Sequence, residues 1–345
     1  MSTGKGEGLP ETWEADRPLN LESGETIYPW KLAYRTWGRL NRERDNVVVV
    51  CHSLTADTNV SEWWGPMKGH KKALDTKKYF IICINALGSP YGSTSPLTFS
   101  EGGLDPTEFP EITVRDVVRS QKMLTDSLGI RGIAAAVGGS LGGMAALEWG
   151  IMYPDIVKSV ISIGSCAANT PWALGFGEVQ RNAITNDPGW NGGKYRGQPP
   201  GLGLARKIAM ISYRSPVSFA ERFGRRLNKD GGNFAVSGYL DYHGKKLLQR
   251  FDANCYLSLL RTMDSHDVGR GRGGWVPALE RLTMPALMIG MSTDALYPPE
   301  EQRKLAAKIE NSRYAEIDSG HGHDAFLMEF EKLSDVVESF MGTLE

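Results

Sequence analysis

The sequence of 345 residues lacks most features that would mark it as a secreted, membrane or nucleic-acid-binding protein. Its formal net charge is -1, and lysine and arginine never form a long run, which argues against nucleic acid or an anionic membrane surface as a partner. No apolar run reaches the length of a transmembrane helix. Residues 1–16 are polar and contain no apolar core of a secretory signal. We therefore expect a cytoplasmic protein.

Cysteine is scarce, and the common cofactor motifs are missing. The four cysteines are Cys51, Cys83, Cys166 and Cys255. They include no C-x-x-C pair, and three lie in or just after apolar runs, which is typical of buried free thiols in a reducing compartment. The chain has neither a P-loop motif nor a G-x-G-x-x-G motif. One H-x-H pair has no further cysteine or histidine cluster nearby, so we expect no metal and no cofactor.

What the sequence does contain is a strand-to-helix junction around Ser140. Residues 133–137 are small or β-branched and uncharged, as in a buried strand, and residues 144–149 are good helix formers. Between them lies Gly138-Gly139-Ser140-Leu141-Gly142, a G-x-S-x-G motif, which lifts a serine hydroxyl above a sheet on a sharp turn. A β-carbon two residues before or after the serine would collide with neighbouring elements. We interpret Ser140 as a nucleophile; a glycine-rich turn without chemistry, or a phosphate loop, is the alternative.

Apolar runs and helical periods alternate along much of the chain. We expect strands at 26–37, 46–51, 79–84, 133–137, 157–164, 284–290 and 314–317, helices at 112–128, 298–309 and 325–341, and a loose lead-in at 1–25. This alternation indicates an α/β protein with a mostly parallel sheet and helices on both faces. Ligands of such sheets bind beyond the carboxyl ends of the strands, where Ser140 would lie.

The segment 166–282 shows no clear strand of a parallel sheet. It contains amphipathic stretches, many aromatic residues and arginines, and a glycine- and proline-rich loop at 187–203. We therefore expect a core domain formed by residues 1–165 and 283–345. A mostly helical lid insertion at 166–282 would interrupt this core.

A serine hydroxyl needs a base and an orienting acid to act as a nucleophile. In this kind of strand–turn–helix scaffold, the acid and then the base follow the serine along the chain. Asp294 lies in the loop after the strand at 284–290 and is the expected acid; a helix N-cap or turn aspartate is the alternative. His321 and His323 compete as the base, and we prefer His323 because it directly precedes the last helix.

Stabilising an oxyanion takes two N–H donors. One is expected from Leu141, which follows the serine. The other should come from the loop after the strand at 46–51, at Leu54 or Thr55. His52 in the same loop precedes the serine in the chain, and we interpret it as a structural histidine.

Several segments, in this order, carry a resemblance to a known family. They are His52-Ser53-Leu54-Thr55, Asn85-Ala86-Leu87-Gly88-Ser89, Phe109-Pro110 with Thr113-Val114-Arg115-Asp116, Gly138-Gly139-Ser140-Leu141-Gly142-Gly143-Met144, Tyr213-Arg214-Ser215 and Gly322-His323-Asp324-Ala325-Phe326-Leu327. Together they resemble the homoserine O-acetyltransferase family of α/β-hydrolase-fold acyltransferases, over about residues 29–327. The segment 87–93 is more similar to the fungal-type branch than to the usual bacterial one.

The resemblance implies an α/β-hydrolase fold and a two-step reaction. An acyl-enzyme forms from acetyl-CoA, and the acetyl group passes to the side-chain hydroxyl of L-homoserine, a step of methionine biosynthesis. By position in the family motifs, Ser140 is the nucleophile, Asp294 the orienting acid and His323 the base. The family also implies a homodimer formed through the helical insertion.

The resemblance further assigns Arg206, Tyr213 and Asp324 to binding of the amino acid. The chemistry is consistent, because Arg206 suits a carboxylate through its planar fork and Asp324 suits an ammonium group. Without the family pattern, Arg206 would be interpreted as a surface helix arginine and Asp324 as a helix N-cap.

One departure from the family pattern leaves the substrates open. Ala56-Asp57-Thr58-Asn59 stands where the family more often has a glycine and small residues, and Asp57 adds a carboxylate there. Succinyl-CoA as donor, and serine or another small alcohol as acceptor, are alternatives with the same chemistry. An esterase, with water as acceptor, is an alternative of another class. The presence of all three triad residues argues against a non-catalytic binding protein.

Overall fold

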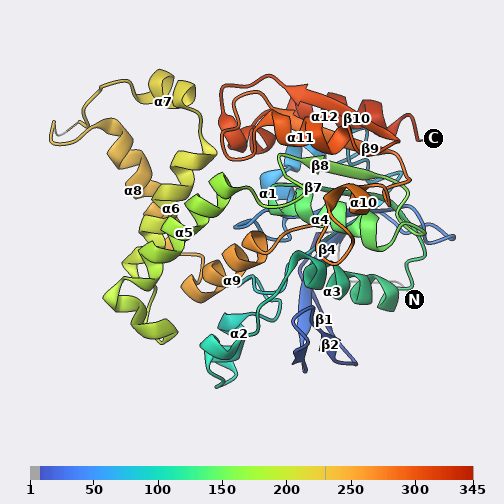
Figure 1. Ribbon diagram of the computed structural model, residues 1–345, viewed down its shortest axis with the longest axis horizontal. Helices are drawn as coiled ribbons and strands as arrows, with labels where there is room; N and C mark the ends of the chain where they lie inside the picture. Colours follow the sequence, from blue (N-terminus) through green and yellow to red (C-terminus); the bar gives the residue numbers. More distant parts are fainter. Residues whose placement is uncertain (1–7, 230, 345) are drawn as a thin grey trace.

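The computed structural model describes residues 8–229 and 231–344 and is built around an eight-stranded sheet (Figure 1). In spatial order the strands are β1 (Glu11–Glu14), β4 (Lys31–Trp37), β6 (Phe80–Ile84), β5 (Val47–Cys51), β7 (Ile133–Gly139), β8 (Val160–Ile163), β9 (Ala286–Met291) and β10 (Ser312–Ile317). The six strands from β6 to β10 run parallel, whereas β1 and β4 are antiparallel to their neighbours. The expected mostly parallel sheet is confirmed.

Helices cover both faces of this sheet because its central strands are apolar on both sides. Every residue of β5 is buried. Val47 and Val49 belong to one core cluster, with α3 (Val114–Ser127) and α4 (Leu141–Met152). Val48 and Val50 belong to a second cluster, with α12 (Phe330–Met341). Because successive side chains of a strand point to opposite faces, β5 contributes apolar residues to the clusters on both faces of the sheet.

The remaining elements outside the segment between β8 and β9 are short. They are β2 (Leu19–Asn20), β3 (Thr26–Ile27), α1 (Val60–Trp63), η1 (Gly65–Met67), α2 (Pro96–Glu101), η2 (Pro106–Glu108), α11 (Pro299–Ala306) and η4 (Gly322–Leu327). The four cysteines are free and buried, as expected. In the part of the chain that the structure describes, no helix is long and apolar enough to cross a bilayer.

Three sequence-based expectations were wrong in detail. The lead-in, where described, is not loose: β1 pairs with β4, and β2 pairs with β3. The single strand expected at 26–37 is interrupted at 28–30, because proline at 29 cannot donate a ladder hydrogen bond. The helix expected at 325–341 is divided into η4 and α12.

The segment between β8 and β9 is helical, as expected. It contains α5 (Pro171–Thr185), η3 (Pro188–Gly193), α6 (Pro200–Tyr213), α7 (Pro216–Phe223), α8 (Ala235–Leu248), α9 (Ala253–Asp264) and α10 (Trp275–Leu279). The loop expected at 187–203 therefore includes η3 and the start of α6. Helices α5 to α8 lie beside the sheet, on the left in Figure 1. Tyr256 and Leu259 of α9 share a buried cluster with Val47, so this helix packs into the core. The division into two domains stays a prediction.

Candidate active site

Ser140 occupies the turn between β7 and α4 in a strained backbone conformation. Its φ is 59° and its ψ is -124°, a region that residues other than glycine rarely adopt. A β-carbon on Gly138 would overlap Gly142, and one on Gly142 would overlap the carbonyl oxygen of Cys51 at the end of β5. These contacts confirm that both glycines are required. The turn places the serine at the carboxyl edge of the sheet, with 5% of its surface exposed.

Asp294 and His323 form a buried pair in the loops after β9 and β10. Their Oδ2 and Nδ1 atoms are 2.7 Å apart. The other oxygen of Asp294 accepts the backbone N–H groups of Leu296 and Tyr297, at 2.9 Å each. The carboxylate is thus held from both sides. Because Nδ1 faces a carboxylate, it carries the ring proton, and Nε2 is left as the acceptor.

The free nitrogen of His323 and the hydroxyl of Ser140 share one cavity of about 50 Å³. Nε2 is buried and has no hydrogen-bond partner among the described residues. A base with an empty acceptor site beside a serine is the arrangement that proton abstraction requires. The structure therefore brings together the three residues that the sequence indicated.

Electrostatics of the site favour a protonatable base. Burial disfavours a charged imidazole, but the charge of Asp294, its hydrogen bond and the charge of Asp324 outweigh burial, so the pKa of His323 is raised above 6.5. An elevated pKa stabilises the imidazolium that forms when the base takes a proton from the serine.

Geometry separates the two histidines. His321 makes no contact with Asp294 and does not line the cavity, whereas His323 does both. The loops that carry acid and base are also tied together: Thr293 Oγ1 accepts the N–H of Gly322 at 3.0 Å. Trp64 Nε1 donates to the carbonyl of Phe326 at 2.9 Å and holds η4 from the other side.

The expected oxyanion donors lie beside the serine. Leu54 and Thr55 line the cavity, and Leu141 is the first residue of α4. Among the described residues, none accepts a hydrogen bond from the backbone N–H of these three. Unpaired N–H groups at a helix start and in a loop are suited to developing negative charge.

His52 holds this oxyanion loop and has no free nitrogen. Its Nε2 accepts the N–H of Ala86 at 2.9 Å, and its Nδ1 donates to the carbonyl of Ser53 at 2.9 Å. Burial lowers the pKa of the imidazole, so the ring stays neutral. The structural role expected for His52 agrees with these contacts.

The insertion supplies the opposite wall of the cavity. Arg206 and Tyr213 of α6 line the cavity, as does Asp324 of η4. The Arg206 guanidinium lies 5.5 Å from the Tyr213 ring centroid, and that ring lies 5.7 Å from the His323 ring. Within the described residues, Arg206 forms no ion pair. All three residues expected to bind a substrate thus lie at one site.

Arg214 is a residue of this site to which sequence reasoning gave no role. It is 7% exposed, and its Nη1 lies 3.7 Å from Asp324 Oδ2. Burial raises the pKa of the Asp324 carboxyl, although the charges of Arg206, His323 and Arg214 oppose this shift. The motif Tyr213-Arg214-Ser215 was noted for the resemblance, but sequence alone does not indicate that an arginine will be buried.

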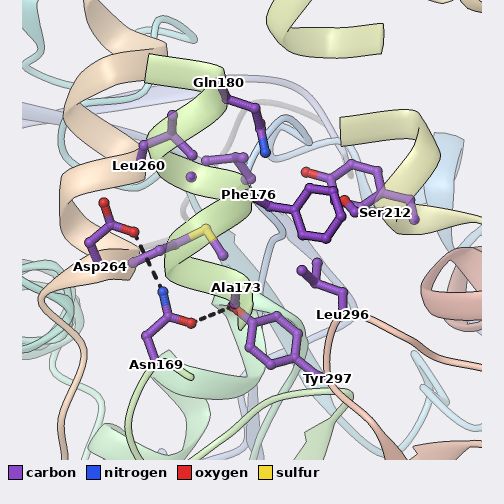
Figure 2. A pocket seen from close by; sticks show the side chains of 13 residues that line it. Asn169, Ala173, Phe176, Gln180, Ser212, Leu260, Asp264, Leu296 and Tyr297 are labelled. Atoms are coloured by element: carbon purple, nitrogen blue, oxygen red, sulfur yellow. Dashed lines mark hydrogen bonds between the residues drawn. The ribbon is translucent and has the colours of Figure 1, made fainter. Parts of the chain in front are cut away.

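A second, smaller pocket of about 20 Å³ adjoins the cavity (Figure 2). Leu54 and Tyr213 line both, so the two are neighbours. In this pocket, the Tyr297 hydroxyl donates to Asn169 Oδ1 at 3.0 Å, and Asn169 Nδ2 lies 3.5 Å from Asp264 Oδ1. The Tyr297 ring packs 5.5 Å from the His323 ring. Neither Tyr297 nor Asn169 was singled out from the sequence.

No metal centre is apparent in residues 8–229 and 231–344, where no group of three or more histidine, cysteine, aspartate or glutamate side chains is arranged to hold an ion.

Comparison with known proteins yields three informative matches. A family model described as the alpha/beta hydrolase fold matches residues 46–328. The sequence is 44% identical, over 345 aligned residues and 97% of each chain, to a homoserine O-acetyltransferase of Chlorobium chlorochromatii (strain CaD3). The structure is similar to that of a homoserine O-acetyltransferase from Bacillus anthracis, with a TM-score of 0.89, 27% identity and 98% of each chain covered.

An enzyme of another class is structurally similar as well. An acetylester hydrolase from Corynebacterium glutamicum matches with a TM-score of 0.86 and 27% identity, covering 97% of this chain and 96% of that one. Fold alone therefore does not separate acyl transfer to an alcohol from acyl transfer to water.

Proposed function

The chain belongs to the homoserine O-acetyltransferase family and has the α/β-hydrolase fold, and from this premise we propose that it transfers an acetyl group from acetyl-CoA to the side-chain hydroxyl of L-homoserine. This step belongs to methionine biosynthesis. The observation that carries the proposal is a single cavity lined by a serine, its base and two oppositely charged side chains, Arg206 and Asp324.

The first half-reaction loads Ser140. His323 Nε2 takes the hydroxyl proton while Ser140 Oγ attacks the thioester carbonyl. The N–H groups of Leu141 and of Leu54 or Thr55 stabilise the oxyanion. The C–S bond then breaks, the thiolate takes the proton from His323, and CoA leaves an acetyl-serine.

The second half-reaction transfers the acetyl group to the acceptor. Arg206 binds the carboxylate of the amino acid, Asp324 binds its ammonium group, and Tyr213 adds a hydrogen bond. His323 takes the proton of the acceptor hydroxyl, which attacks the acetyl-serine, and the serine leaves with that proton. Orientation favours the amino acid over bulk water, because a positioned hydroxyl gains an effective molarity of about 10⁵ M or more.

Hydrolysis by water is the second candidate, favoured by the structural similarity to an acetylester hydrolase. Against it stands the buried charge at the site. An esterase for neutral esters has no need of Arg206 and Asp324 lining the cavity, and placing charged groups there costs free energy.

A CoA-release assay tests the function. Acetyl-CoA and succinyl-CoA are each offered with homoserine, serine or water as acceptor. The proposal expects fast CoA release only with acetyl-CoA and homoserine, and parallel lines in double-reciprocal plots. Equal rates with and without an acceptor would favour the esterase, and a preference for succinyl-CoA or serine would assign another substrate.

Several finer proposals remain. We propose acetyl-CoA as a co-substrate with no further cofactor, a homodimer formed through the insertion, and a cytoplasmic location. Membership of the fungal-type branch also stays a prediction, and the relatives named above are bacterial. Asp57 lines neither cavity, and its Oδ1 accepts the N–H of Asn59 at 2.7 Å, which leaves the acetyl and homoserine assignment in place.

A further inference from the structure

Cations on the insertion continue outward from the wall of the cavity. Arg222 of α7 stacks 4.7 Å from the Tyr239 ring centroid, and the Tyr239 ring lies 4.5 Å from the ring of His243 on α8. The His243 ring also lies 5.2 Å from the ring of Tyr242, and Lys246 Nζ lies 6.0 Å from the centroid of that Tyr242 ring. We call Arg222 and Lys246 the outer cation group; His243, whose ring contacts Tyr239 and Tyr242, accompanies it. None of the three lines the cavity itself.

The outer cation group lacks neutralising carboxylates. Arg222 and Lys246 are exposed, and neither forms an ion pair within the described residues. Helix α8 does neutralise a cation elsewhere, because its Asp241 pairs with Lys207 of α6. Exposed cations held by aromatic rings, without a carboxylate partner, retain their capacity to bind an anion.

The imidazole of His243 is uncharged beside these cations. Its pKa is lowered to about 4, first by burial and then by the charges of Arg206, Lys246, Arg222 and Arg214. Two of these four cations, Arg222 and Lys246, are in the outer group, and Arg206 lines the cavity. Helix α8, which carries His243 and Lys246, also packs against α6, which carries Arg206, so the outer cation group adjoins the helix that forms a wall of the cavity.

We propose that Arg222 and Lys246 bind the phosphate groups of the CoA thioester donor. This inference rests on the proposed function, since it concerns the same donor. CoA carries its thiol at one end of a flexible arm and a diphosphate and a 3′-phosphate at the other. A cavity of about 50 Å³ encloses the reacting end only, so the phosphates lie outside it. Arginine and lysine side chains bind phosphate oxygens through charge-assisted hydrogen bonds.

The test compares two donors that share the thioester and differ in the phosphates. Acylation of Ser140 is followed with acetyl-CoA and with S-acetylpantetheine, which has no phosphate. The double variant Arg222→Gln, Lys246→Gln should lower kcat/KM for acetyl-CoA by about tenfold or more, mainly through KM, on the scale of hydrogen bonds to charged groups. The value for S-acetylpantetheine should stay at the wild-type level.

Matched controls are available nearby. Arg225→Gln and Lys245→Gln each remove an exposed cation from the same part of the insertion, and neither residue is among the charges acting on His243. Both variants should keep the wild-type preference for acetyl-CoA. Adenosine 3′,5′-bisphosphate should compete with acetyl-CoA in the wild type and in both controls, but about tenfold more weakly in the double variant.

The outcomes are distinct. An equal loss with both donors would show a structural effect and overturn the subsite, as would an unchanged kcat/KM for acetyl-CoA in the double variant. If the two controls lost the preference for acetyl-CoA as strongly as the double variant, the effect would come from the general positive charge of the insertion. That result would also overturn the proposed subsite. If neither donor acylates Ser140 in the wild type, the proposed function fails, independently of the subsite.

Discussion

The cavity lies between residues of the insertion at 166–282, here called the insertion wall, and residues outside it, here called the core wall. The two walls differ in how their polar groups are partnered. On the core wall, Asp294 accepts three hydrogen bonds and His52 uses both ring nitrogens, while His323 Nε2 is left open for the serine proton. On the insertion wall, Arg206 has no ion-pair partner among the described residues, and the buried Nε of Arg214 is unpartnered as well. The core wall is thus preorganised for proton transfer, whereas the insertion wall keeps its binding capacity for a substrate.

This contrast predicts that substitutions in the two walls should affect different kinetic steps. Core-wall residues act on the making and breaking of acyl bonds, so their loss should lower turnover with any donor. Insertion-wall residues act on charged substrate groups, so their loss should appear mainly in KM and in the fate of the acyl-enzyme.

The largest effect is expected from the core wall. Ser140→Ala and His323→Ala should each reduce kcat by about four to six orders of magnitude, because members of a triad act as a unit. Steady-state CoA release and mass spectrometry of the acylated serine measure this. His321→Ala is the matched control and should retain most activity. The reverse ranking of the two histidines would overturn the assignment of the base.

On the insertion wall, Arg206→Ala should raise the KM of homoserine by about 100-fold, the scale of a lost charge-assisted contact. The burst of Ser140 acylation from p-nitrophenyl acetate should stay nearly intact, and hydrolysis should become the main fate of the acyl-enzyme. Arg206→Lys should rescue only in part, because the planar fork is lost. Loss of the burst with an unchanged acceptor KM would remove Arg206 from the acceptor site.

A junction between the walls should give a smaller effect. Tyr297 donates to Asn169 in the first loop of the insertion (Figure 2). The backbone N–H of Tyr297 donates to Asp294. Asn169→Ala and Tyr297→Phe should each lower kcat by about tenfold or less, the range for one hydrogen bond. The double variant should lose no more than either single variant, because both remove the same contact. Additive losses would contradict this coupling.

The smallest effect concerns the pH profile. The charge of Asp324 is among the causes that raise the pKa of His323, so acylation by p-nitrophenyl acetate should fall as the pH drops through a value above 6.5. Asp324→Asn removes that charge, lowers the pKa of His323 and should shift the acidic limb to lower pH by less than about one unit. A shift to higher pH would contradict the electrostatic account.

The catalytic residues of the core wall were the ones that the sequence predicted best. Ser140, Asp294 and His323 lie on loops directly after β7, β9 and β10, and apolar strands followed by such loops leave a strong sequence pattern. The junction at Ser140 needs glycines at fixed spacing because the backbones approach closely. The β1 and β2 strands were missed because edge strands of a few residues carry little periodic signal.

The substrate-binding residues were predicted by resemblance more than by pattern. Arg206 and Asp324 match family positions, but their residue types alone would indicate a surface arginine and a helix cap. Arg214 received no role, since its burial depends on how η4 and α6 pack. A helical period gives the face of a helix that is buried, without saying which distant charge it will meet.

The sequence by itself determined the α/β alternation, the nucleophile turn and the order of serine, acid and base, because each depends on local backbone requirements or on the ends of apolar strands. Only the tertiary structure decided that His323 and not His321 meets Asp294, that Tyr297 links the acid loop to Asn169, and that unpaired cations continue from the cavity onto α7 and α8. These features depend on contacts between segments far apart in the chain, which packing of the insertion against the sheet brings together.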